Sequence, residues 1–280
     1  MKKYFAALSL FVLVAFCSCQ KFAGDPISKD FSIHSYYTQL DVEDAFDVTV
    51  SDAVDVITVT VGENIMPKVV VEIVENTLKI HLKGINHSNY GTDMKVVIPY
   101  NADLTSVELS GASIFRSEFG LEGRKVDVDL SGASDIYCDI DADEVKIDLS
   151  GASTFTGAIL ADEIEMDLSG SSDITGNVSA TYLGLDMGGS SDATLEGEVT
   201  TLSIDLAGAS TLKKTVVGNR YGIVCEYCNG EMSGSSDAYI HCDGTIQVNL
   251  SGSSELHFTG TAFTGDSHTS GSSEIIHDVL

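Results

Sequence analysis

The chain has 280 residues, of which 42 are Asp or Glu and only 15 are Lys or Arg, so its formal net charge is −27 at pH 7. A surface with this excess of negative charge repels phosphate backbones, and we therefore predict that nucleic acid is not a partner. Trp is absent, Pro occurs three times, and many of the 26 Gly recur at a regular spacing.

Residues 1–18 have the features of a lipoprotein signal peptide. Two lysines are followed by an apolar run that is too short to span a bilayer. The small residue Ser18 precedes Cys19, as bacterial lipoprotein signal peptidase requires, so we predict that Cys19 carries the lipid. The alternative is cleavage by ordinary signal peptidase and a soluble product. Removal of residues 1–18 takes away two lysines and no acid, which moves the formal charge from −27 to −29.

We expect residues 19–30 to be a lipid-bearing tether. Several acyl chains anchor a protein stably, so the mature chain would be held in the cell envelope, at the outer membrane, facing the periplasm or the surface. Residues 31–107 contain strand-like runs without a repeat, and we predict that they form irregular first coils and a cap. The stretch 84–93 reads as a loop.

A tetrapeptide Ser-Gly-Ala/Ser-Ser returns nine times in residues 108–280, with variation only at its first residue. The gaps between its glycines are 21, 19, 19, 19, 19, 26, 18 and 19 residues. This period is too short for a helical hairpin repeat. The glycines are Gly111, Gly132, Gly151, Gly170, Gly189, Gly208, Gly234, Gly252 and Gly271. We expect this corner to be structural, because small residues allow a sharp turn and close approach of neighbouring coils.

Apolar residues occupy alternate positions before each glycine, which predicts a strand with one buried face. A second strand follows, with apolar residues four and eight positions after the glycine, and Val216 and Val279 fall in the latter column. One coil cannot bury its own apolar face, so equivalent positions must stack. We therefore predict an all-β fold, a single-stranded parallel β-solenoid of about 19 residues per coil, right-handed by the crossover rule.

The longest gap, from Gly208 to Gly234, predicts an insertion near residues 213–230. Basic and aromatic side chains gather there, and an insert of this kind is a natural recognition loop. The alternative is an insertion without a role. The candidate recognition residues are Lys213, Lys214, Arg220, Tyr221 and Tyr227.

Four cysteines lie beyond the signal region. Cys225 and Cys228 form a lone CxxC pair, which is weak evidence for metal or redox chemistry. Cys138, Cys228 and Cys242 fall in inward columns, so we expect buried thiols that pack as small apolar groups. A disulfide inside the long loop and a metal site are the alternatives.

An acidic column stands three residues before the glycines and points outward on the predicted coil. Neighbouring carboxylates at the ~4.8 Å strand spacing repel by roughly 1 kcal/mol per pair even in water. Calcium binding would relieve the repulsion, because hard oxygen ligands suit this ion. The alternative is a solvated acidic face, and the calcium-binding Gly-Gly-x-Gly-x-Asp pattern is absent. The calcium candidates are Asp129, Asp148, Asp167, Asp186 and Asp205.

The opening Phe31-Ser32-Ile33, the run from Asp44 to Val50, Leu78-Lys79-Ile80 and the repeated Leu-Ser-Gly-Ala-Ser from Leu109 resemble the head GIN-domain family of auto-transporter adhesins. The resemblance covers roughly residues 31–280. It implies a pectin-lyase-like parallel β-helix on exported bacterial lipoproteins. It brings no catalytic residues and no established activity.

We therefore expect a non-enzymatic cell-envelope lipoprotein whose rigid solenoid serves adhesion or the binding of a glycan, a protein or a surface. One alternative is a polysaccharide lyase or hydrolase. Lyase chemistry needs a base and charge neutralisation, and the few basic residues of the repeat do not share one column. The other alternative is a structural component that assembles through its coil ends, which would give a homo-oligomer. We predict no catalytic residue and no cofactor other than calcium.

Overall fold

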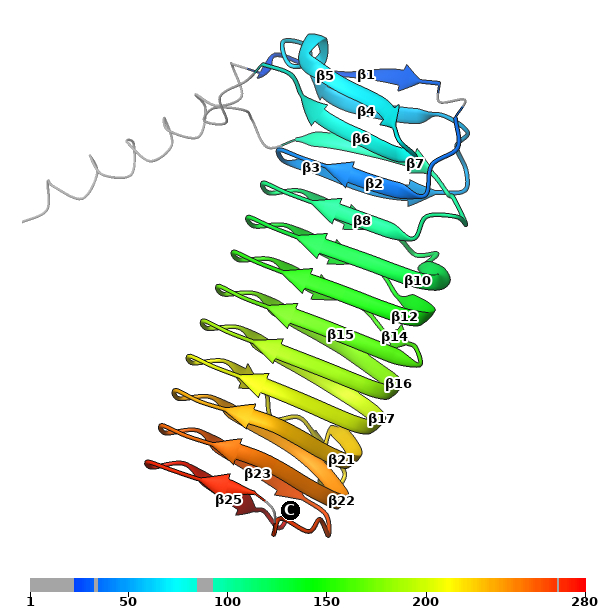
Figure 1. The fold of residues 1–280 in the computed structure, drawn as a ribbon. Coiled ribbons are helices and arrows are strands. Elements are labelled where there is room, and N and C mark those ends of the chain that lie inside the picture. Colours follow the sequence, from blue (N-terminus) through cyan, green and yellow to red (C-terminus); the bar gives the residue numbers. More distant parts are fainter. Residues whose placement is uncertain (1–22, 33–34, 85–92, 266) are drawn as a thin grey trace, which may run out of the picture.

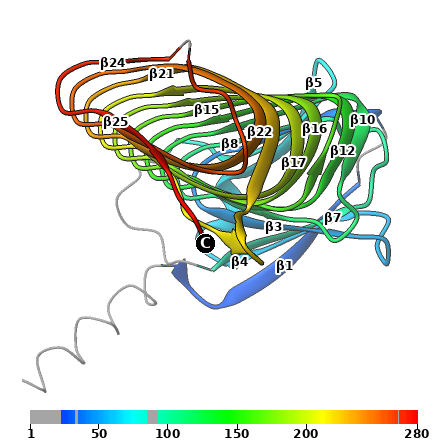
Figure 2. The ribbon, with the colours of Figure 1, turned by 90° about the horizontal axis from the view of Figure 1, so that it is seen from below.

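The computed structural model describes residues 23–32, 35–84, 93–265 and 267–280. The predicted signal peptide, Cys19 and most of the predicted loop 84–93 lie outside these residues. The described chain is an elongated stack of parallel coils (Figure 1). The view along the stack shows the coils nested one behind another (Figure 2). The predicted all-β parallel solenoid is confirmed.

The coils are stacked in register, one repeat directly over the next. Leu130 pairs with Leu149, and Leu149 pairs with Leu168. Every member of this inward column is at most 2% exposed, so branched and linear aliphatics form one continuous buried file. The column continues through Met187, Leu206, Met232 and Leu250.

Two broad faces and a narrow edge enclose this core. The strands that end at the Ser-Gly corner form what we call the ladder face. They are β2 (Gln39–Val42), β8 (Ser106–Leu109), β10 (Leu121–Leu130), β12 (Ile140–Leu149), β15 (Glu163–Leu168), the second halves of β16 (Asp173–Met187) and β17 (Asp192–Leu206), β21 (Ile223–Met232), the second half of β22 (Asp237–Leu250), and β24 (His268–Thr269).

The strands that follow the corner form the back face. They are β3 (Phe46–Ser51), β9 (Ile114–Arg116), β11 (Asp135–Tyr137), β13 (Thr154–Thr156), the first halves of β16 and β17, β18 (Thr211–Leu212), the first half of β22, β23 (Glu255–Thr259) and β25 (Glu274–His277). The starts of β10 and β12 pair with each other along the narrow edge, where β14 (Ile159–Leu160) and the middle of β16 continue the stack.

The first end of the solenoid is covered by a cap with antiparallel pairings. β1 (Pro26–Phe31) pairs with β4 (Ile57–Gly62), and β4 pairs with β7 (Met94–Pro99). β5 (Val69–Val74) follows the short 3-10 helix η1 (Met66–Lys68) and pairs with β6 (Thr77–Leu82). β1 begins inside the segment predicted to be tether. Within the described residues, no helix is long and apolar enough to cross a membrane.

The corner depends on backbone-to-backbone contact between glycines. Gly170 has φ +78°, and a Cβ built on it would lie 2.5 Å from the carbonyl oxygen of Gly151 in the previous coil. The last Ser of each corner is buried, and its hydroxyl donates to the carbonyl three residues earlier, as Ser153 does to Ser150 at 2.9 Å. The repeated sequence therefore provides a positive φ, a close approach and an internal hydrogen bond at each turn.

Two residues of the predicted inward column are exposed instead. Val216 lies in the insertion, and its expected place beside Gly197 is taken by Ile223. Val279 lies beyond the last strand β25 and is exposed. The error at Val216 comes from counting across the irregular gap, and the error at Val279 comes from counting beyond the end of β25 at His277.

We predict that Gly170→Ala destabilises the protein by at least about 2 kcal/mol, because the substitution forces a side chain into a positive-φ backbone and against a carbonyl. Gly188→Ala is the matched control in the next corner, since nothing lies within 4 Å of its added Cβ. We expect the control to change stability by less than about 0.5 kcal/mol. Urea unfolding of both variants measures the difference, and equal losses would contradict the role assigned to the glycine stack.

Candidate functional site: the acidic row and the insertion

The predicted acidic column forms one continuous line of carboxylates on the ladder face. We call it the acidic row. Its members are register partners from coil to coil, so like charge lies over like charge. The row consists of Glu108, Asp129, Asp148, Asp167, Asp186, Asp205 and Glu231. It extends into the cap, where Asp41 pairs with Glu108 and Lys79 pairs with Asp41. The sequence analysis missed this extension because the cap lacks the Ser-Gly repeat from which the positions were counted.

The pKa values of four carboxyl groups in the row, those of Glu108, Asp129, Asp167 and Asp186, are raised, with partial burial as the first cause. Partial burial raises the pKa of Asp129, and the neighbouring Asp148 raises it further. The pKa of Asp186 is raised in the same way by partial burial and by Asp205. Lys146 is the basic side chain that relieves the middle of the row, with Nζ 2.9 Å from Asp148 Oδ2 and 3.8 Å from Asp167 Oδ2.

The row borders shallow hollows in the ladder face. One hollow of about 470 Å³ lies along Asp129, Asp148, Asp167 and Asp186. In the part of the chain that the structure describes, no three His, Cys, Asp or Glu side chains converge as a metal-ion site. Calcium binding at Asp129, Asp148, Asp167, Asp186 and Asp205 therefore stays a prediction, in which each ion is shared between neighbouring coils.

We predict that Asp186→Asn raises stability at pH 7 by about 0.5 kcal/mol, the scale of surface charge effects. The raised pKa of Asp186 in the folded state means that its charge opposes folding at neutral pH. As the pH falls through this raised pKa, the wild type binds the proton and the difference between the two proteins disappears. Melting temperatures between pH 7 and pH 3 measure the effect. Asp52→Asn removes the same charge from an exposed turn, and an equal gain there would show that only net charge matters.

The insertion is shorter than predicted. Leu212 is in register with Ala193 and Ile223 with Gly197, so residues 213–222 replace residues 194–196 of the previous coil and add seven residues. The chain from 223 to 230 belongs to a regular coil. Within the insertion, β19 (Val216–Val217) and β20 (Arg220–Tyr221) form a two-stranded antiparallel hairpin. Of the candidate recognition residues, Tyr227 lies outside it, on the ladder-face strand β21.

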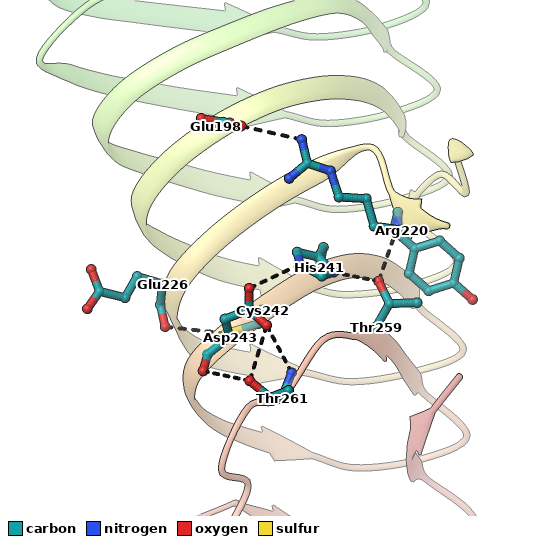
Figure 3. A network of polar contacts seen from close by, with 9 residues as sticks. Glu198, Arg220, Glu226, His241, Cys242, Asp243, Thr259 and Thr261 are labelled. Atoms are coloured by element: carbon teal, nitrogen blue, oxygen red, sulfur yellow. Dashed lines mark hydrogen bonds and ion pairs between the residues drawn. The ribbon is translucent and has the colours of Figure 1, made fainter. Parts of the chain in front are cut away.

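The insertion is tied to several coils by polar contacts (Figure 3). Arg220 Nη2 lies 3.3 Å from Glu198 Oε1 on β17. The backbone N–H of Tyr221 donates to Thr259 Oγ1 on β23 at 3.2 Å, and His241 Nδ1 on β22 lies 2.9 Å from the same oxygen. At the base of the insertion, Lys213 Nζ lies 2.9 Å from Asp192 Oδ2.

Tyr221 is fully buried and therefore not available as a surface contact. Its hydroxyl donates to the carboxylate of Asp278, which also lies 2.9 Å from Nδ1 of His257. The hydrogen bond from Tyr221 lowers the pKa of Asp278, while burial raises the pKa of Tyr221. Lys214 Nζ lies over the rings of Tyr221 and Tyr239, at 5.2 and 5.8 Å from their centroids. The insertion thus acts as a clamp on the last coils.

We predict that Tyr221→Phe lowers stability at pH 7 by about 1.5–3 kcal/mol, the usual value of a hydrogen bond to a charged group. The lowered pKa of Asp278 means that its ionised form supports folding above the unfolded pKa near 4. The loss in Tyr221→Phe should therefore shrink as the pH falls below about 4. Tyr227→Phe changes an exposed hydroxyl and serves as the control, and a control that melts as early as Tyr221→Phe would contradict the clamp.

All four cysteines of the described chain are buried free thiols. Cys225 and Cys242 are register partners inside adjacent coils, and Cys228 faces the same interior. Burial raises the pKa of Cys138 to about 12. Hydrogen bonding to Cys228 first, and then burial, raises the pKa of Cys225. Thiols held in the protonated form are poor nucleophiles and poor metal ligands. The disulfide and metal alternatives of the sequence analysis stay untested.

The ladder face has one further feature that the column analysis missed. Gly184 stands in an outward column where other coils carry Lys146, Glu165 or Ser203. The ring of Tyr182 lies over this glycine, with its hydroxyl oxygen 3.2 Å from where a Cβ would stand. A hollow of about 210 Å³ lies beside the ring and the carboxylates of Asp167 and Asp186. A glycine at an outward position of a repeat is the sequence signal that marks room for a neighbouring ring.

The described chain is thus a capped parallel β-solenoid with a polar, acidic surface. The family model described as "Putative auto-transporter adhesin, head GIN domain" matches residues 36–159 and 154–262, and the chain belongs to this family. The resemblance noted in the sequence is therefore confirmed. The family is described by adhesion and not by a reaction. No curated protein matches the chain.

Three solved structures share the fold. One, described as a "Putative lipid binding protein" from Parabacteroides distasonis ATCC 8503, is 20% identical with a TM-score of 0.63, over 91% of this chain and 97% of that one. A "putative adhesin" from the same organism is 17% identical with a TM-score of 0.62, over 91% and 95%. A "putative adhesin" from Parabacteroides merdae ATCC 43184 is 16% identical with a TM-score of 0.62, over 91% and 97%.

Proposed function

We propose that this chain is an exported, non-enzymatic cell-envelope lipoprotein whose solenoid is a rigid adhesion surface. The observation that carries the proposal is the in-register stacking of equivalent coils. It gives the rod rows of similar side chains at ~4.8 Å spacing, and the eight intervals between nine coils extend about 38 Å. A rod with repeated rows can hold an extended ligand at several equivalent points. Membership in the adhesin family supports the same function.

The electrostatics of the acidic row favour binding over hydrolysis. A glycoside hydrolase needs two carboxyl groups whose environments push their pKa values apart. In the row, the pKa values of Glu108, Asp129, Asp167 and Asp186 are all raised, and partial burial is the first cause in each. Carboxyl groups whose pKa values are raised together by partial burial do not divide into a general acid and a general base.

The basic residues give no support to lyase chemistry either. Lyases place a free base and a cation at one point, whereas here the basic side chains are spread over different faces and five of them are paired with acids. Arg116 pairs with Asp47, and Lys125 lies 3.0 Å from Asp127. Lys146, Lys213 and Arg220 have the acidic partners described above.

Assembly through coil ends meets an obstacle at the first end of the rod. There the antiparallel pairs β1–β4 and β5–β6 belong to the cap instead of presenting a parallel coil (Figure 1). Stacking of one rod on another would have to pair the last coil with this cap. Presentation of single rods from an N-terminal lipid therefore agrees better with the fold.

We predict that Cys19 is the lipidated residue. In the bacterium that produces the protein, Cys19→Ala should abolish incorporation of labelled palmitate and release the chain from membranes. Cys17→Ala is the matched control and should keep the label, because Cys17 follows the bulky Phe16. Label retained in Cys19→Ala, or lost only in Cys17→Ala, would contradict the proposed anchor.

Adhesion further requires that the rod be outside the cell. Protease added to intact cells should remove the described region, and cells lacking the protein should attach less to immobilised polysaccharide and glycoprotein surfaces. Restoring the wild-type chain should restore attachment. A chain that is cut only after the outer membrane has been permeabilised would contradict a role in adhesion.

A further inference from the structure

Two adjoining hollows lie outside the acidic row and the insertion, toward the narrow edge of the rod. The first, of about 250 Å³, is lined by Tyr36, Tyr37 and Tyr100 together with Asp55 and Asn101. Tyr36 is 61% exposed and Tyr100 is 42% exposed. Both rings therefore present apolar area to solvent.

The second hollow, of about 380 Å³, runs along four successive coils where β10, β12 and β14 begin (Figure 1). Three intervals between coils give it a length of about 14 Å. Its apolar floor includes Phe119 and Leu160, and Leu160 is 51% exposed. The rings of Tyr100 and Phe119 are in contact, with centroids 4.8 Å apart and planes at 37°. Since one ring lines each hollow, the two hollows lie side by side across this ring pair, and we call them together the aromatic groove.

The charged groups of the aromatic groove are all carboxylates, and its neutral polar side chains come from Tyr, Asn and Ser. Asp55 lines the first hollow, and none of the lining residues of either hollow is Lys or Arg. The carboxylates of the second hollow are Glu118, Glu122, Asp139 and Asp141. Ionised carboxylates only accept hydrogen bonds. An anionic ligand would be repelled here, whereas a ligand with many neutral donors would be held.

The fixed geometry of the first hollow suits a site that is already formed. Asn101 Nδ2 donates to the carbonyl oxygen of Tyr37 at 2.8 Å, and its Oδ1 accepts from the backbone N–H of Asp103 at 3.0 Å. In the second hollow, Asp139 Oδ1 accepts from the backbone N–H of Ala158 at 2.7 Å. Pockets that bind small molecules combine apolar walls with a few positioned polar groups in this way.

We propose that the aromatic groove binds a segment of a neutral polysaccharide. A pyranose ring has an apolar C–H face that stacks on an aromatic ring, and an edge of hydroxyl donors that matches carboxylate acceptors. The lack of basic groups excludes uronic-acid and sulfated chains. This inference deepens the proposed adhesion function by naming its site and ligand class. Binding in solution does not depend on the lipid or on cell-surface exposure, so the two proposals fail separately.

Calorimetric titration of residues 20–280, the mature chain without the lipid-bearing Cys19, tests the site with defined hexasaccharides. The neutral probes are cellohexaose, mannohexaose and N-acetylchitohexaose, and the anionic probe is hexagalacturonate. We expect at least one neutral probe to bind with a dissociation constant below about 1 mM, and hexagalacturonate to bind at least tenfold more weakly. Failure of all three neutral probes, or equal binding of hexagalacturonate, would overturn the proposal. So would tighter binding of the basic hexapeptide Ala-Lys-Ala-Lys-Ala-Lys than of any sugar.

Variants then assign the binding to the aromatic groove. Tyr36→Ala and Tyr100→Ala should each weaken binding of the neutral probe at least tenfold. The matched control is Tyr137→Ala, because Tyr137 is 39% exposed but lies on the back-face strand β11. Tyr36 is mostly exposed, so Tyr36→Ala keeps the test valid even if Tyr100→Ala disturbs its ring partner Phe119. Binding unchanged in Tyr36→Ala, or reduced equally in Tyr137→Ala, would place the sugar elsewhere and overturn the proposal.

Discussion

The whole structure depends on the close approach of successive corners. From Gly132 onward, each corner glycine lies against the backbone of the glycine one coil earlier, and Gly111 lies against the backbone of Asp44, at distances that leave no room for a Cβ. This contact fixes the register between coils, because a shift of one residue would replace the glycine by a residue with a side chain. It would also turn every apolar column toward solvent. The buried file from Leu130 to Leu250 is therefore a consequence of the corner as much as of hydrophobicity.

The same register creates the main electrostatic cost of the fold. A parallel in-register stack places identical residues over one another, which benefits aliphatic side chains inside and penalises charged ones outside. Partial burial is the first cause of the raised pKa values of Asp129 and Asp186, and the stacked neighbours Asp148 and Asp205 add to it. Lys146 relieves the penalty between Asp148 and Asp167, and Lys79 relieves it at Asp41. A cationic or hydrogen-bond-donating ligand bound to the acidic row would reduce the repulsion between its carboxylates, and this relief would favour binding.

The repeat made most of the fold predictable from the sequence. The period, the inward columns and the acidic row follow from residues such as Leu130, Leu149 and Leu168, whose neighbours in space are given by adding 19 to the residue number. Where the repeat period is broken, counting residues from the glycine no longer predicts which positions stack. Val216 was placed inward although it lies in the insertion, and Asp41 was not recognised as part of the row. The burial of Tyr221 depends on Asp278, which is 57 residues away, and no local pattern indicates such a contact. The aromatic groove could not be predicted either, because no local pattern indicates that Tyr36, Tyr100 and Phe119 lie close together.

The clamp explains how a solenoid with a weak final coil holds together. The last coil replaces the aliphatic columns with Gly265, Ser267 and Thr269, so it buries little apolar area and gains less from stacking. The insertion compensates from outside the core. It leaves the stack before β21, pairs Arg220 with Glu198, and places Tyr221 against Thr259 and Asp278. The final coils are thereby linked to β17 by side chains that bypass the core. In a one-dimensional stack, where each coil otherwise contacts only its neighbours, such a link couples the fraying of the end to the stability of the middle.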